Sequence, residues 1–264
     1  MIPLISVSWS AVSQGIARFD PLFFGSSMRN VVGEGGGAVH AVYGTLWITG
    51  LATLMAVPIG LMTAIYLAEY GQRSRTAKAI TFFVDVMTGI PSIVAGLFAY
   101  ALFALFLGPG VRMGIMGSIA LAVLMIPVVV RSSEEMLRLV PNELREAAYA
   151  LGVPKWLTIV KVVLPTSIAG ITTGIMLSIS RVIGETAPLL ITAGFTASMN
   201  YDLFSGRMQT LPVFTYNQYV SQGIPPEAYL DRAWASALTL IIIVMLLNLV
   251  ARIIARVFAP KSSR

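Results

Sequence analysis

The feature that most restricts this sequence is a set of long apolar stretches that carry almost no charge. Residues 41–68 contain no charged side chain in 28 consecutive positions, whereas a membrane-spanning helix needs about 20 predominantly apolar residues. The five predicted spans lie at about residues 41–68, 79–107, 113–130, 166–193 and 233–255. The predicted fold class is therefore an all-α polytopic membrane protein with a single transmembrane domain, residues 1–264.

The composition excludes several classes of protein. Only 11% of the residues are charged and 56% are hydrophobic, whereas soluble domains contain about 25% charged residues. This argues against a soluble enzyme and against a disordered chain, which needs low hydrophobicity. The absence of Cys and the single histidine, His40, exclude thiolate metal sites, His clusters and a Cys nucleophile. We therefore expect no catalysis, no cofactor, no metal and no nucleic acid bound by this chain.

The distribution of Lys and Arg predicts the orientation in the membrane. Residues 69–78, 131–161 and the tail after residue 251 hold three, five and four basic residues, more than the segments between them. The positive-inside rule places these three segments, and hence the C-terminus, in the cytoplasm. The N-terminal 40 residues and the loop 194–232 are then external. Residues 1–17 are uncharged but too short to cross, so we interpret them as the outer end of a sixth span.

Nucleotide binding is not expected of this chain itself. The motif Gly-x-x-x-x-Gly-Lys-[Ser/Thr], which holds nucleotide phosphates, is absent. The Gly-rich residues 33–37 lack the lysine, and we expect them to be a flexible segment before the first clear span. Any ATP used by this protein must therefore be bound by a partner.

The loop between the third and fourth predicted spans, residues 131–165, contains a regular series of residues that typically begin and end helices. Ser132 with Glu135 fits a helical capping box, and a short helix is predicted over residues 142–151. Gly152 can supply a left-handed stop to that helix, and Pro154 can begin the next one. The loop is either a solvated connector or a surface on which another protein docks.

The same loop resembles the motif of bacterial ABC importer permeases known by its residues Glu-Ala-Ala. In that family the motif continues with three residues, Gly, nine residues and Ile-x-Leu-Pro, and here Val162 replaces the isoleucine. The resemblance implies that the loop docks on an ATPase subunit. The matching residues are Glu146, Ala147, Ala148, Gly152, Leu164 and Pro165.

Four further segments, from about residue 38 to 255, resemble the phosphate permeases of the PstA family: residues 181–190, 66–70, 89–94 and 131–137. The resemblance implies the transmembrane domain of a type I ABC importer with six spans, in a bacterial cell membrane. It also implies that the chain is the permease subunit of an ATP-driven importer of inorganic phosphate. The implied partners are a homologous second permease, two ATPase subunits that use ATP and Mg, and an extracytoplasmic phosphate-binding protein.

Two charged residues interrupt the fourth predicted span. Arg181 is the midpoint of the apolar residues 169–193, where a charge is costly and marks a functional site by default. Glu185 would share its helical face and pair with it. The pair either fixes helix packing or forms an anion site, because a guanidinium matches phosphate oxygens bidentately. Thr186 can donate a hydrogen bond to a passing anion.

Two charges lie near the inner ends of other spans. Arg131 by itself is typical of an ordinary cytoplasmic anchor, but the resemblance implies that it takes part in phosphate transport, as does Arg181. Asp85 is expected to pair with a nearby Lys or Arg.

Two other functions fit the residues. A different tetrahedral oxyanion satisfies the same chemistry as phosphate. A proton-coupled secondary transporter would explain Arg181 and Glu185 but leaves the ordered loop without a purpose. Residues 194–232 are long enough to form a landing surface for an external binding protein.

Overall fold

The computed structural model describes residues 2–71 and 74–258, and in these ranges it contains helices and no strand. Four helices are long and apolar enough to cross a membrane, and α4 with α5 is a fifth candidate if the two count as one broken span. The predicted helical membrane fold is confirmed, with roughly the predicted number of spans. Arg73, Lys261 and Arg264, which contributed to the predicted orientation, lie outside the described residues.

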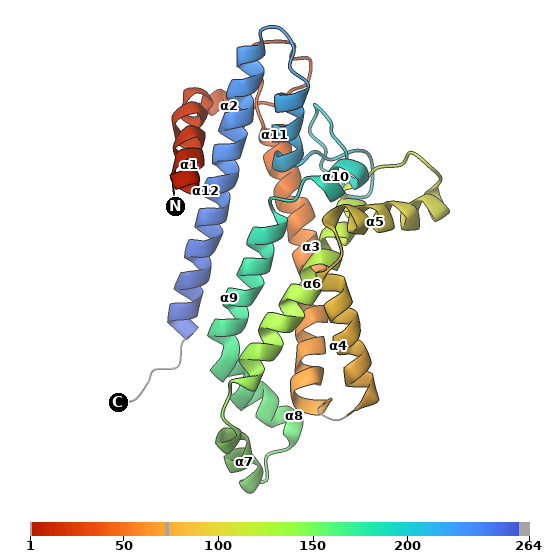
Figure 1. Ribbon diagram of the computed structural model, residues 1–264, viewed down its shortest axis with the longest axis vertical. Coiled ribbons are helices and arrows are strands. Elements are labelled where there is room, and N and C mark those ends of the chain that lie inside the picture. Colours follow the sequence, from red (N-terminus) through yellow and green to blue (C-terminus); the bar gives the residue numbers. More distant parts are fainter. Residues whose placement is uncertain (1, 72–73, 259–264) are drawn as a thin grey trace. The chain divides into compact units, whose positions relative to one another are not determined.

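The elements follow one another along the chain as drawn in Figure 1. They are α1 (Ile2–Gly15), η1 (Ile16–Arg18), α2 (Pro21–Gly25), α3 (Val39–Ile65), η2 (Tyr66–Tyr70), α4 (Arg75–Thr88), α5 (Ser92–Leu107), α6 (Gly114–Arg138), α7 (Asn142–Ala150), α8 (Lys155–Thr158), η3 (Ile159–Val163), α9 (Leu164–Val182), α10 (Ala187–Thr192), α11 (Leu211–Val220) and α12 (Pro226–Phe258). η2 and η3 are π-helical turns that directly follow an α-helix.

These helices contribute to two compact units. Unit 1 consists of the described residues of Met1–Ala52, Pro91–Leu121 and Arg181–Met245. Unit 2 consists of those of Thr53–Ile90, Ala122–Ser180 and Leu246–Arg264.

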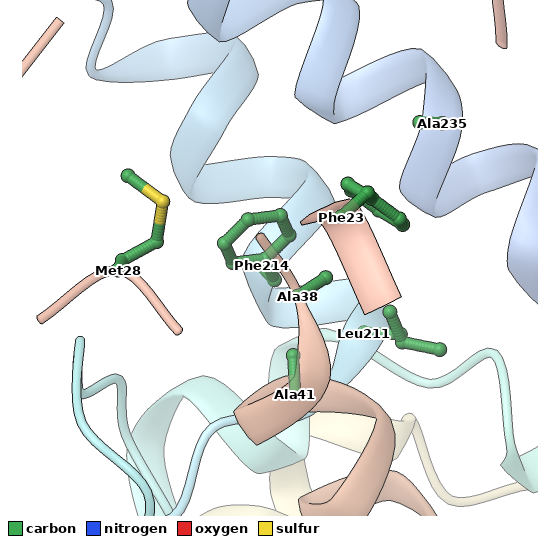
Figure 2. Packing of buried hydrophobic residues seen from close by; sticks show 7 residues of the cluster. All are labelled: Phe23, Met28, Ala38, Ala41, Leu211, Phe214 and Ala235. Atoms are coloured by element: carbon green, nitrogen blue, oxygen red, sulfur yellow. The ribbon is translucent and has the colours of Figure 1, made fainter. Parts of the chain in front are cut away.

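The core of unit 1 brings residues from both ends of the chain together. Figure 2 shows Phe23 from α2 and Phe214 from α11 beside Ala38. Asp20 caps α2 by accepting a hydrogen bond from the backbone N–H of Phe23 at 2.7 Å. The remaining members of this apolar cluster are Met28, Ala41, Leu211 and Ala235.

Unit 1 forms side-chain hydrogen bonds to the Gly-rich residues 33–37, the segment that we predicted to be flexible. Arg232, which is completely buried, donates hydrogen bonds to the carbonyls of Gly33 at 2.7 Å and Gly35 at 2.9 Å. Arg18 donates to the carbonyl of Gly36 at 2.9 Å. All three glycines have positive φ angles, a backbone conformation that residues with a Cβ rarely adopt.

Unit 2 contains two apolar clusters of buried residues. One contains Ala64 and Ala68 from α3 and η2 together with Leu137, Val163 and Ile171. α3 and α6 approach closely, since a Cβ placed on Gly60 would lie 2.7 Å from a methyl carbon of Val129. Small residues commonly permit such close contacts between membrane helices.

The prolines within the predicted spans have different effects. α3 continues through Pro58 and α6 through Pro127. At Pro91, in contrast, the helix predicted over residues 79–107 is broken, because α4 ends at Thr88 and α5 begins at Ser92. The residue before a proline disfavours helical backbone angles, and proline itself has no N–H to donate. Within unit 1, α5 contacts α10, where a Cβ on Gly96 would lie 2.6 Å from Cα of Pro188.

Two local predictions are corrected or left open. The capping box at Ser132 is wrong, because α6 runs without interruption to Arg138 and the Ser132 hydroxyl donates to the carbonyl of Val128 at 2.9 Å. Helix α1 occupies most of residues 1–17, but its 14 residues are shorter than a span. The interpretation of this segment as part of a sixth span remains a prediction.

Candidate functional site

The predicted helix, left-handed glycine and second helix of the loop are confirmed in unit 2, where α7 and α8 follow α6 (Figure 1). Gly152 has a φ of 75°, and its N–H donates to the carbonyl of Tyr149 at 2.9 Å. The N–H of Val153 closes the turn on the carbonyl of Ala148 at 3.1 Å. No atom lies within 4 Å of a Cβ placed on Gly152, so its backbone conformation, not lack of space, requires glycine.

The exposed face of this loop is larger and more aromatic than the sequence suggested. Glu146 and Ala147 are exposed, whereas Ala148 is buried and does not belong to the exposed face. Leu151 and Trp156 are 83% and 61% exposed. The exposed apolar and aromatic side chains of α7, the Gly152 turn and α8 are Leu144, Tyr149, Leu151 and Trp156, and we call them the docking face.

The last two residues of the motif lie at the start of α9. Leu164 is half-buried and packs against the apolar cluster of unit 2. Pro165 is exposed and directly follows the π-helical turn η3 and Leu164, inside a helical run that continues from Lys155 to Val182. Proline has no N–H to donate to the preceding turn of that run.

The side of α7 opposite its exposed residues is held by an ion pair that the sequence analysis missed. Arg145 binds Glu69, with Nη2 2.7 Å and Nε 3.1 Å from Oε1. The side chains of Arg145 and Glu69 are 13% and 4% exposed, so the pair is largely shielded from water. The two residues are 76 positions apart in the chain, and no local pattern relates them.

Arg145 also binds backbone carbonyls at the end of α6. It donates to the carbonyl of Val140 at 2.6 Å and to that of Leu137 at 2.9 Å. Lys155 from α8 donates to the backbone carbonyl of Glu69 and lies 4.7 Å from the centre of the Tyr70 ring. The end of α3 with η2, the end of α6, α7 and α8 therefore meet at one polar centre.

Arg131 is surrounded by carboxylates within unit 2. It forms an ion pair with Asp85 on α4 and a second with Glu134 at 3.3 Å. Glu134 is itself buried and binds Arg138 at 2.7 Å. The expectation that Asp85 pairs with a nearby basic residue is confirmed. An anion that binds Arg131 must therefore compete with two carboxylates.

Arg181 and Glu185 do not form the pair that we predicted. Helix α9 ends at Val182, a turn follows, and α10 begins at Ala187. The two residues thus do not share one helix face, and neither has an ion pair or side-chain hydrogen bond with any residue of the described ranges. The N–H of Glu185 binds the carbonyl of Val182 at 3.1 Å, and the Arg181 side chain is exposed.

Thr186 precedes α10 and lines a cavity of about 640 Å³ in unit 1. The cavity lies among α10, α11 and α12, and most of its lining is apolar. Its polar groups are Thr186, Thr215, Tyr216, Tyr219 and the indole of Trp234. Arg181 does not line this cavity, so the structure brings Thr186 but not the arginine to it.

Comparison with known proteins identifies the class. The family described as "Binding-protein-dependent transport system inner membrane component" matches residues 56–264, and the chain belongs to that family. An inward-facing structure of the MetNI methionine ABC transporter has a TM-score of 0.69 with 18% sequence identity, covering 84% of this chain and 96% of that one. This likeness supports the predicted fold, the transmembrane domain of a type I ABC importer.

Sequence relatives are more specific. The phosphate transport system permease protein PstA 1 of Mycobacterium tuberculosis (strain CDC 1551 / Oshkosh) is 49% identical over 257 residues, covering 96% of this chain and 83% of the relative. The phosphate transport system permease protein PstA of Yersinia pestis is 40% identical over 258 residues, covering 98% and 84%. The predicted resemblance to this group of permeases is confirmed.

Proposed function

We propose that this chain is a transmembrane permease subunit of an ATP-driven importer of inorganic phosphate. Two named relatives, at 49% and 40% identity over nearly the whole chain, are phosphate permeases. The observation in the chain itself that carries the proposal is the docking face beside Gly152. Four large exposed side chains on a helix–turn–helix segment fit a surface that another protein covers.

The docking face receives the ATPase. Glu146 and Ala147 lie on the same exposed segment, and Gly152, Leu164 and Pro165 set the course of the chain from α7 into α9. ATP and Mg²⁺ are bound by the partner ATPase subunits, because this chain has no phosphate-binding loop. The chain itself is a non-catalytic membrane subunit.

The complete importer contains this permease, a homologous second permease, two ATPase subunits and an external phosphate-binding protein. The binding protein lands on external segments, including residues 194–232. The excess of Lys and Arg in residues 69–78 and 131–161 places these segments, and the C-terminus, on the cytoplasmic side of a bacterial cell membrane.

Arg181 is the residue proposed to contact phosphate on the transport path. Its exposed guanidinium has no carboxylate partner in the described part of the chain, so its charge is available to an anion. A guanidinium matches two phosphate oxygens with parallel hydrogen bonds. Glu185 and Thr186 follow in the turn after α9 and supply a proton acceptor and a hydroxyl. Arg131 is a second proposed contact, which competing carboxylates hold while no anion is bound.

The decisive experiment is uptake of radioactive phosphate by proteoliposomes that contain the whole complex. Uptake is expected to require ATP, the ATPase subunits and the phosphate-loaded binding protein. Sulfate in excess is expected not to compete, and competition would instead favour a broader oxyanion permease. Uptake driven by a proton gradient without ATP would contradict the proposal and favour a secondary transporter.

A further inference from the structure

We infer that Arg145 and Glu69 form a clamp through which movement of the coupling helix α7 reaches the inner ends of α3 and α6. The inference rests on the proposed function, in which α7 receives the ATPase. Arg145 and Glu69 are positioning residues in this scheme, because neither contacts the transported ion.

The first argument is the number of elements that Arg145 joins. Its side chain begins on α7, its Nε and Nη2 bind the Glu69 carboxylate on η2, and its Nη1 and Nη2 bind the carbonyls of Val140 and Leu137. The last carbonyls of a helix have no partner within that helix. One guanidinium that belongs to α7 therefore binds a last-turn carbonyl of α6, a carbonyl of the segment that follows α6, and the carboxylate of Glu69 in η2.

The second argument is that Glu69 is held from two sides. Its carboxylate binds Arg145, and its backbone carbonyl accepts a hydrogen bond from Lys155 on α8. Lys155 in turn lies over the ring of Tyr70 at 4.7 Å. Glu69 lies in a π-helical turn, a conformation that is rare and occurs often at functional sites. The helices on both sides of Gly152 are thus bound to the same turn.

The third argument is that the backbone segments on either side of α7 link it only weakly to the neighbouring helices. Apart from these contacts and local packing, α7 is joined to α6 by residues 139–141 and to α8 by the turn at residues 151–154. Such short irregular segments absorb movement by changing their backbone angles. A bidentate pair shielded from water resists separation, because removing one partner leaves the other charge buried and unpaired. The pair therefore carries a displacement of α7 directly to two spans.

The experiment compares phosphate transported per ATP hydrolysed in proteoliposomes of the complete complex, at equal amounts of assembled complex. In Glu69→Gln the ratio is expected to fall about ten-fold, because a charge-assisted contact between α7 and η2 is replaced by a weaker neutral one. In Arg145→Lys it is expected to fall about three-fold, because lysine keeps the charge but lacks the planar fork. The matched control is Glu135→Gln, the same substitution at an exposed carboxylate of α6, which leaves the ratio unchanged.

Each outcome has one meaning. If the wild-type complex transports phosphate with ATP but both variants keep its ratio, the clamp is not a coupling element and the inference is wrong. The same holds if transport and ATP hydrolysis fall in equal proportion, or if neither variant assembles, because the pair then serves folding alone. If the wild-type complex itself transports no phosphate, the proposed function fails instead.

Discussion

Two arginines of this chain, Arg145 and Arg181, have opposite environments. Arg145 is largely buried and uses its guanidinium on one carboxylate and several carbonyls. Arg181 is exposed at the end of a helix, with no such partner in the described part of the chain. The difference separates two uses of the same side chain. Where the protein itself satisfies the guanidinium, it organises the fold, and where the protein leaves it open, the charge is available to a substrate.

The largest effect is expected at Arg232 in α12, which is completely buried. Arg232→Ala leaves the side-chain oxygen of Gln218 and the carbonyls of Gly33 and Gly35 without their donor. The loss of several charge-assisted hydrogen bonds is expected to lower the free energy of unfolding by about 3–5 kcal/mol. Thermal unfolding of the purified complex measures it.

The matched control for Arg232 is Arg29→Ala, which removes an exposed arginine close to the same glycine-rich segment. Its expected effect is within about 0.5 kcal/mol, as for most surface substitutions. Equal destabilisation by the two variants would show that the buried contacts of Arg232 do not organise the fold.

The second prediction concerns Arg181, the exposed arginine of the comparison. Arg181→Ala is expected to reduce phosphate uptake about 100-fold, because two charge-assisted hydrogen bonds to the anion are worth about 3 kcal/mol together. Assembly of the complex and its thermal stability are expected to stay unchanged, in contrast to Arg232→Ala. Uptake by proteoliposomes and size-exclusion chromatography measure the two properties. Normal uptake by this variant would remove Arg181 from the transport path.

A third, smaller effect is expected at Gly152, where the left-handed backbone conformation, not a charged contact, determines the local structure. Gly152→Val forces a β-branched residue into a left-handed backbone at a cost of about 1–2 kcal/mol. Binding of the ATPase subunit is therefore expected to weaken about ten-fold in a pull-down titration.

The control for Gly152 is Gly50→Ala in α3, where a Cβ meets no atom within 4 Å and the backbone is helical. Alanine is a better helix former than glycine, so no loss of ATPase binding is expected. If Gly152→Val also binds the ATPase normally, the turn does not set the geometry of the docking face.

The smallest effect is expected near Arg131. This guanidinium is intermediate between Arg145 and Arg181, because it is partly exposed and forms ion pairs with Asp85 and Glu134. Asp85→Asn removes an exposed competitor, and exposed ion pairs contribute about 0–1 kcal/mol. If phosphate contacts Arg131, the apparent KM for phosphate uptake by the Asp85→Asn complex falls about two- to three-fold. Glu135→Gln, an exposed neighbour in α6, is the control and leaves KM unchanged. A higher KM in Asp85→Asn would indicate that the pair with Asp85 orients Arg131 for transport.

Features encoded within short segments were predictable from the sequence. The apolar spans follow from composition over about 20 residues, and the loop of α7, Gly152 and α8 follows from residues whose backbone preferences are local. The resemblance to phosphate permeases also rests on contiguous residues, and comparison with relatives confirms it. The end of α9 at Val182 was missed, because length and hydropathy do not reveal where a helix ends within an apolar stretch.

The sequence by itself determined that this chain is a helical membrane protein with an ordered loop and very few charges to spare. Only the tertiary structure decided how those charges are used. Glu69 and Arg145 are separated by 76 positions, and Arg232 binds carbonyls almost 200 positions away. Helical periodicity relates residues three or four positions apart, whereas packing of distant helices determines which charges are satisfied and which remain open.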